Sequence, residues 1–190
     1  MPDRTPLETW TAEMAKPQAK YPREDFVRFV RRNNFPKESS FLDMGCGGGG
    51  NSLFLCNEGF NVDAVDFVRS VEIIWPTFHF HEADLTAWDF PSEKYDCVLD
   101  NSTLCHIEDG DLVLEKARNS LKPGGKIFSV WPTCFNKPSQ FGDKGYIKLL
   151  SPEEGRVYFK DFRDLRIGRL SYTDFSSMRS LTYWLIEGSK

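Results

Sequence analysis

The chain has 190 residues, of which 40% are hydrophobic and 27% are charged, and its formal net charge is -4. This length and apolar content suit one globular domain over residues 1–190 with a core of its own. The small net charge argues against a basic nucleic-acid-binding module and against an acidic disordered tail. No stretch approaches the ~18 apolar residues of a membrane-spanning helix, and no apolar segment follows the first charged residues as in a secretory signal. We therefore expect a cytoplasmic protein that binds neither nucleic acid nor a membrane.

Short apolar segments with the composition of strands alternate with helical segments over most of the chain. Helices are predicted over residues 5–16, 22–34, 51–58, 68–75 and 109–121, and strands over residues 40–44, 62–66, 78–83, 96–100 and 126–131. This alternation indicates an α/β fold, in which a parallel sheet carries helices on both of its faces.

The alternation then stops. Residues 133–150 contain scattered aromatic side chains and have the composition of an inserted loop. The motif Ser151-Pro-Glu-Glu is a capping box that begins a further helix. Two late strands are expected at 165–173 and 180–187, and the turn between them is short. These two strands must run antiparallel, because a parallel pair needs a crossover of about a dozen residues or more.

A glycine-rich segment, DMGCGGGG from Asp43 to Gly50, joins the first strand to a helix. Glycine lets the backbone approach a ligand closely, and the following helix start offers unpaired N–H groups. The pattern Gly45-x-Gly47-x-x-Gly50 formally matches the dinucleotide fingerprint, with Asp66 about 20 residues further on. The carboxylate of Asp43 repels a pyrophosphate, however, and suits a ligand with ammonium and sulfonium charges. The loop therefore favours S-adenosylmethionine over NAD.

Five motifs in this order resemble those of the class I S-adenosylmethionine-dependent methyltransferases, especially the small bacterial kind. The resemblance covers about residues 22–188 and is carried by Leu42–Gly49, Asp66, Glu82–Leu85, Tyr95–Asn101 and Leu121–Gly125. It implies a Rossmann-like fold with a seven-stranded, mostly parallel sheet, helices on both faces and an antiparallel last strand. It also implies S-adenosylmethionine as the cofactor and S-adenosylhomocysteine as the product.

The resemblance assigns a role to individual residues at the methionine end of the cofactor. The residues placed there are Asp43, Gly45, Cys46, Gly47, Gly49 and Asn101. The glycine loop would line the methionine part with backbone, Asp43 would lie near the ammonium group directly or through water, and the Asn101 carbonyl would accept from the same group.

Further residues would hold the adenosine end. Asp66 would accept both ribose hydroxyls, since a carboxylate has two acceptor oxygens and no donor. Phe67 would pack on the adenine ring. Asp84 would accept from the adenine amino group, and the backbone N–H of Leu85 would address a ring nitrogen.

The methyl acceptor is less specified than the donor. A hydroxyl acceptor needs a base, and His106, which follows the fourth strand in NSTLCHI, is the candidate. We expect transfer to a small molecule, with oxygen in a sugar or another small metabolite slightly preferred. Eight Lys/Arg against five Asp/Glu occur from Lys137 to Arg169, and this mild basic excess is compatible with an anionic acceptor. Residues 1–20 are expected to fold over the cofactor as a lid, and residues 133–150 to border the acceptor.

Other possibilities stay open at this point. Aromatic residues that would wall the acceptor pocket are Trp10, Trp131, Phe135, Phe141 and Tyr146. No metal site is expected, because His79 and His81 lack a third ligand nearby. The alternative functions are an NAD(P)-dependent oxidoreductase on the same glycine loop and a non-catalytic module that binds S-adenosylmethionine. The chain is expected to be a monomer or a homodimer.

Overall fold

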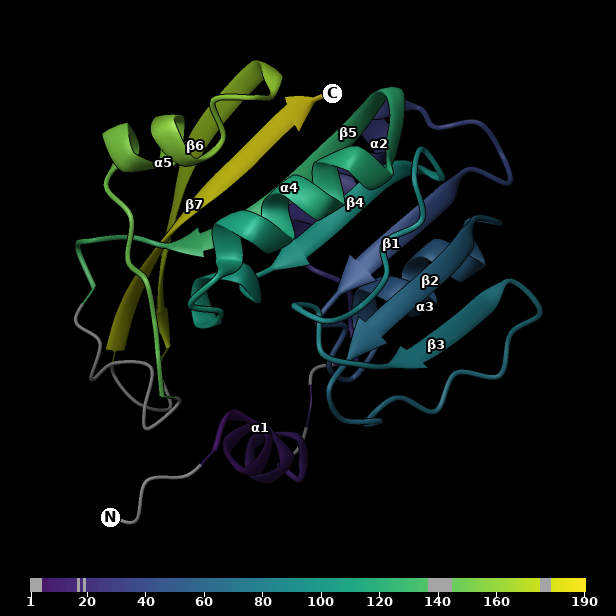
Figure 1. Ribbon diagram of the computed structural model, residues 1–190, viewed down its shortest axis with the longest axis horizontal. Coiled ribbons are helices and arrows are strands. Elements are labelled where there is room, and N and C mark those ends of the chain that lie inside the picture. Colours follow the sequence, from purple (N-terminus) through teal and green to yellow (C-terminus); the bar gives the residue numbers. More distant parts are fainter. Residues whose placement is uncertain (1–4, 17, 19, 137–144, 175–178) are drawn as a thin grey trace.

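The computed structural model describes residues 5–16, 18, 20–136, 145–174 and 179–190. Its centre is a seven-stranded sheet in the order β3-β2-β1-β4-β5-β7-β6 (Figure 1). The strands are β1 (Ser40–Met44), β2 (Asn61–Asp66), β3 (Phe78–Glu82), β4 (Tyr95–Asn101), β5 (Leu121–Pro132), β6 (Arg163–Asp174) and β7 (Arg179–Ser189). The first five strands are parallel, and β7 is antiparallel to both β5 and β6. The predicted fold is thereby confirmed.

Helices cover both faces of the sheet. They are α1 (Pro6–Met14), α2 (Glu24–Asn33), α3 (Gly50–Asn57), α4 (Gly110–Ser120) and α5 (Pro152–Tyr158), together with the short 3-10 helix η1 (Leu104–His106). Capping boxes begin α1 at Thr5 and α5 at Ser151, where each hydroxyl accepts a backbone N–H three residues later. Among the described residues, no helix is long and apolar enough to cross a membrane.

Each face of the sheet has its own hydrophobic cluster. Val113 and Ala117 of α4 are fully buried with Phe159, just after α5, on one face. Phe26 and Phe29 of α2 pack on the other face, where both rings lie against Phe128 of β5 at centroid distances of 5.4 and 5.1 Å. Figure 1 shows α4 and α5 in front of the sheet, and α2 and α3 behind it. The sheet is therefore covered on both faces, as its apolar strands require.

One predicted element is wrong. Residues 68–75 form no helix and run as an irregular segment between β2 and β3. The segment is rich in β-branched residues, and Val71 is buried at 3% exposure against Gly49. Ser70 Oγ also donates to the Gly47 carbonyl at 2.8 Å. Packing against the glycine loop thus overrides the weak helical pattern of this segment.

The order of the strands locates the place where a ligand can bind. Chain progression moves outward from β1 through β2 to β3 and then restarts on the other side at β4. Ligands of open α/β sheets bind at such a switch point, beyond the carboxyl ends of the strands. In Figure 1, α1 lies beyond these strand ends, apart from the helices that cover the faces.

Candidate functional site

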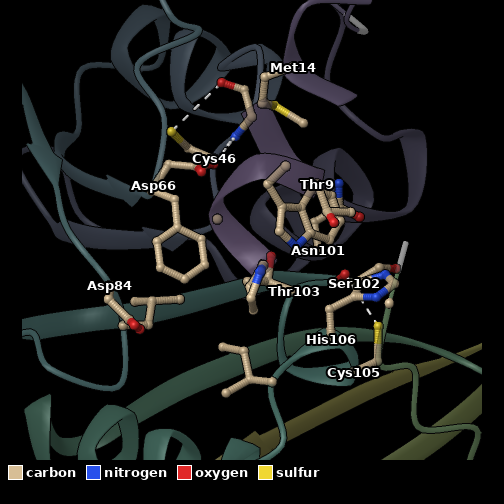
Figure 2. A pocket seen from close by; sticks show the side chains of 18 of the residues that line it. Thr9, Met14, Cys46, Asp66, Asp84, Asn101, Ser102, Thr103, Cys105 and His106 are labelled. Atoms are coloured by element: carbon tan, nitrogen blue, oxygen red, sulfur yellow. Dashed lines mark hydrogen bonds between the residues drawn. The ribbon is translucent and has the colours of Figure 1, made fainter. Parts of the chain in front are cut away.

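A cavity of about 1190 Å³ opens at the switch point between β1 and β4. Its lining comes from the glycine loop, from the chain after β2, β3 and β4, and from α1. This volume exceeds the roughly 300–1,000 Å³ of a pocket for one small ligand. Figure 2 shows Cys46, Asp66 and Asp84 at one end of the cavity and His106 at the other, with Thr103 between them. The cavity is large enough for a cofactor and a small acceptor together.

The glycine loop forms one wall of this cavity. Gly45 and Gly47 have φ values of +66° and +52°, a region that residues with a side chain rarely adopt. A Cβ on Gly45 would lie 2.2 Å from Thr103 Oγ1, whereas a Cβ on Gly47 would meet only Met14 Sδ, at 4.0 Å. Gly45, Cys46 and Gly47 line the cavity, as expected. The loop is therefore closed by Thr103 on one side and open to the cavity at Gly47.

Unlike Gly45, Cys46 and Gly47, Gly49 lies away from the cavity. It is buried and does not line the cavity, and it caps the start of α3 with φ +76°. A Cβ there would lie 2.5 Å from Val71 Cγ2. Its observed role is to let the 68–75 segment pack against the loop.

We expect Gly45→Ala to destabilise the protein more than Gly124→Ala. Both glycines have positive φ, so both variants carry strain of about 1–2 kcal/mol. A Cβ at Gly124 meets nothing within 4 Å, whereas one at Gly45 collides with Thr103. Urea unfolding of the two variants measures the difference in the free energy of unfolding. Equal losses would show that the contact with Thr103 is not tight.

Asp43 lies buried beneath the glycine loop. Ser52 Oγ donates to its Oδ2 at 2.6 Å, and Oδ1 has no hydrogen-bond partner among the described residues. Burial, with a smaller contribution from the nearby charges of Asp66 and Asp100, raises the pKa of this carboxyl to about 7, although the Ser52 hydrogen bond opposes the shift. Asp43 does not line the cavity, so its unpaired buried oxygen would act on a cationic group of a ligand from beneath the loop, through its charge or through a water. The residues present therefore fit the ammonium group of S-adenosylmethionine.

The residues predicted for adenosine follow β2 and β3, next to the glycine loop. Asp66 ends β2, and its Oδ2 accepts the Gly47 N–H at 2.8 Å; burial raises its pKa. Phe67 is half-buried and lines the cavity beside Leu85. Asp84 Oδ1 accepts from both the backbone and the hydroxyl of Thr86, each at 2.8 Å. Asp66, Phe67, Asp84 and Leu85 all line the cavity, as the ribose and adenine assignments require.

The chain after β4 supplies the other end. Asn101 lines the cavity, and η1 places the half-buried His106 on its wall. His106 Nδ1 lies 3.0 Å from the Tyr146 carbonyl oxygen. Because a carbonyl only accepts, Nδ1 carries the proton, and the neutral ring then has its lone pair on Nε2. Trp10 of α1 packs edge-on against this ring, at a centroid distance of 4.9 Å.

The aromatic residues predicted for the acceptor wall divide into groups. Trp10 and Tyr146 line the cavity. Trp131 does not: it is fully buried in the core, where its Nε1 donates to the Lys148 carbonyl. Phe135 is 63% exposed and packs on Trp184 instead. Phe141 lies outside the described residues. The prediction is wrong for both residues: Trp131 belongs to β5 and packs on Tyr158 and Phe159, and Phe135, just after β5, packs on β7.

Several of the residues that line the cavity were not predicted from the sequence. Tyr183 comes from β7, which only the sheet order brings beside β5. Thr9 and Met14 reach the cavity because α1 lies across the strand ends. Thr103 had a possible signal, since a β-branched residue after the polar strand end Asn101-Ser102 is positioned to pack on a glycine.

Neither histidine of β3 belongs to the cavity. His79 is exposed, and His81 Nε2 lies 3.4 Å from Asp63 Oδ1. Within the described ranges, no group of three or more His, Cys, Asp or Glu is arranged to hold a metal ion.

Comparison with known proteins identifies the family. Residues 14–177 match the family model described as a methyltransferase domain. The chain belongs to the S-adenosylmethionine-dependent methyltransferases. Solved structures of this family share the fold: an enzyme from Archaeoglobus fulgidus has a TM-score of 0.69 and 18% identity, over 89% of this chain and 95% of the other. Phosphoethanolamine N-methyltransferase 2 of Haemonchus contortus, in complex with phosphomonomethylethanolamine and S-adenosylhomocysteine, has a TM-score of 0.71 and 15% identity. That alignment covers 98% of this chain and 57% of the other.

Sequence relatives of this methyltransferase act on different acceptors. Phosphoethanolamine N-methyltransferase 3 of Arabidopsis thaliana is 32% identical over 114 residues, which are 55% of this chain and 23% of the plant protein. A ubiquinone biosynthesis O-methyltransferase of Hydrogenovibrio crunogenus is 29% identical, over 54% of this chain and 46% of the other. The chain thus spans about a quarter of the length of the plant relatives. Membership of this family excludes the alternative of an NAD(P)-dependent oxidoreductase and identifies S-adenosylmethionine as the cofactor.

Proposed function

We propose that this methyltransferase transfers a methyl group to a small-molecule acceptor, and that the accepting atom is a hydroxyl oxygen of a sugar or another small metabolite. The observation that supports an oxygen acceptor is His106, which faces the cavity with Nδ1 donating to the Tyr146 carbonyl. A hydroxyl is a poor nucleophile until it loses its proton, and a neutral imidazole can accept that proton at Nε2. The names of the relatives, which include both N- and O-methyltransferases, support a small acceptor but do not favour either atom.

The chain's residues divide the work of the transfer. When bound, S-adenosylmethionine supplies a methyl group that its sulfonium already activates. Asp43 and Asn101 would hold the ammonium end, and Asp66, Phe67, Asp84 and Leu85 would hold the adenosine end. Trp10 and His106 would exclude water from the acceptor and orient its hydroxyl, so that the reacting atoms lie in line. His106 would then take up the hydroxyl proton.

The described lining adds no support for an anionic acceptor. Arg23 lines the cavity, but its guanidinium makes two hydrogen bonds to Asp25, at 3.0 and 2.8 Å. Glu108 and Asp109 line the cavity beside His106. The cations of the basic excess that belong to α5 and β6 do not line it. We therefore place neutral acceptors ahead of anionic ones.

We also propose that the N-terminal 20 residues act as a lid, and that residues 133–150 border the acceptor. Thr9, Trp10 and Met14 of α1 line the cavity, and Met14 Sδ lies over Gly47. Tyr146 lines the acceptor end, and the Lys148 N–H donates to the Cys105 carbonyl at 2.8 Å. Both segments would thus cover bound ligands, while residues 137–144 lie outside the described residues.

A screen of acceptors tests the proposed function. The protein is incubated with S-adenosylmethionine and a panel of sugars, phenols, hydroxylated quinones, ethanolamine phosphates and free amines, and S-adenosylhomocysteine formation is followed. Turnover with hydroxyl acceptors is the expected result, and turnover with amines only would contradict the oxygen preference. Tight binding of S-adenosylhomocysteine without turnover on any compound would favour the non-catalytic alternative.

Cofactor binding is expected to release a proton near neutral pH. The pKa of Asp43 is raised to about 7, and an ammonium group beside it favours the ionised carboxylate. Affinity for S-adenosylhomocysteine should therefore rise as the pH increases toward about 7 and then level off. Calorimetry in buffers of different ionisation enthalpy counts the protons released. Asp43→Asn, which keeps an acceptor for Ser52, is the matched control and should abolish this release; equal release from both proteins would exclude Asp43 as its source.

A further inference from the structure

A buried carboxylate next to the proposed site has no part in the transfer described above. Asp100, at the end of β4, is 0% exposed and does not line the cavity. Its Oδ1 accepts the backbone N–H groups of Thr103 and Leu104, at 2.9 and 3.0 Å. Its Oδ2 accepts from the hydroxyl of Ser129 on β5. One side chain thus joins two strands of the sheet to the start of η1.

The hydrogen bonds of Asp100 shape the turn that carries His106. Ser102 has φ +62°, an uncommon value for a residue with a side chain, so the chain reverses sharply after β4. The N–H groups of Thr103 and Leu104 stand at the start of η1, where helical partners are missing. Asp100 satisfies both of them, and η1 then ends at His106.

The same turn also contacts the glycine loop, on the side of the proposed methyl-donor site. Thr103 Oγ1 donates to the Met44 carbonyl at 2.9 Å, and the Thr103 side chain fills the space that Gly45 leaves empty. On the far side of η1, the Lys148 N–H donates to the Cys105 carbonyl, and the Tyr146 carbonyl accepts from His106. The turn therefore has contacts with the glycine loop at one end and with the 146–148 segment at the other.

We propose that Asp100 is a positioning residue that acts through η1. It holds the imidazole of His106 at a fixed place relative to the glycine loop and in the tautomer that carries its proton on Nδ1. This inference rests on the proposed role of His106 as the base. It adds a residue that touches neither cofactor nor acceptor but determines whether Nε2 faces the acceptor in the proton-accepting form.

Nitrogen-15 NMR of histidine side chains tests the proposal without an acceptor. The chain contains three histidines, and the variants His79→Gln and His81→Gln assign the signals. Spectra are recorded for the full chain, alone and saturated with S-adenosylhomocysteine. We expect the Nδ1–H tautomer of His106 in the wild type and in Asp100→Asn, whose Oδ1 still accepts both N–H groups. Asp100→Ala should show a mixture of tautomers, with the Nε2–H form increased.

Asp63→Ala is the matched control. Asp63 is also a buried strand carboxylate, accepts from the Tyr95 hydroxyl at 2.7 Å and does not line the cavity. This variant should lower the melting temperature and leave the His106 tautomer unchanged. Should Asp100→Ala fail to fold, Ser129→Ala and Thr103→Val remove single contacts and should shift His106 in the same direction by less.

The proposal is overturned if these Asp100, Ser129 and Thr103 variants keep the wild-type His106 spectrum, or if Asp63→Ala changes it equally. With any acceptor found by screening, Asp100→Ala should lower kcat at least 10-fold and leave the S-adenosylhomocysteine Kd within a factor of about three. A failed acceptor screen would weaken the proposed function, whereas the NMR result judges the positioning role separately.

Discussion

Replacing His106 by Ala should lower kcat by about 100-fold or more, which is the usual contribution of a general base. The imidazole is the group on the acceptor side whose neutral form can take up a hydroxyl proton, and Nδ1 is held by the Tyr146 carbonyl. Affinity for S-adenosylhomocysteine should stay nearly unchanged, because His106 lies at the opposite end of the cavity from Asp66 (Figure 2). Single-turnover kinetics with an acceptor from the screen measures the chemical step.

The control for this variant is His79→Ala, which removes an exposed imidazole from β3. It should retain full activity. Full activity of His106→Ala with a hydroxyl acceptor would reduce His106 to a packing partner of Trp10. An equal loss of kcat and of cofactor affinity would instead indicate that η1 had collapsed against the glycine loop.

Replacing Asp66 by Ala should weaken S-adenosylhomocysteine binding by about 1.5–3 kcal/mol, or roughly 10- to 150-fold in Kd. The carboxylate ends β2 at the edge of the cavity and is placed to accept the ribose hydroxyls. It also accepts the Gly47 N–H at 2.8 Å, so its removal frees one donor of the loop. Isothermal titration calorimetry measures the change.

Asp89→Ala provides the comparison, because Asp89 is an exposed carboxylate that does not line the cavity. Its Kd should equal that of the wild type. An unchanged Kd for Asp66→Ala would refute the ribose assignment. The Kd of Asp66→Asn should lie between those of the wild type and Asp66→Ala, since an amide keeps one acceptor oxygen but loses the charge.

The sheet could be predicted from the sequence because its strands are buried on both faces. The segments Phe41–Met44 and Val62–Val65 are apolar except for one aspartate each, and all eight residues are buried. The antiparallel pair followed from the short turn alone, since geometry forbids a parallel connection of that length. Local pattern and tertiary structure agree in these elements.

Failures occurred where packing between distant segments decides the structure. The helix predicted over 68–75 does not form, because Val71 and Ile73 pack against Gly49. The local sequence pattern does not predict this contact. Tyr183 reaches the cavity only through the order of β5, β7 and β6. In each case the partner is remote in sequence.

The irregular segment that follows β2 has a consequence for how this cofactor site can vary. Ser70 holds the Gly47 carbonyl from outside, and Val71 and Ile73 support Gly49 from behind. The shape of the glycine loop thus depends on residues 68–75, which form no helix or strand. We expect changes in residues 68–75 to alter the shape of the glycine loop without replacing any residue that lines the cavity.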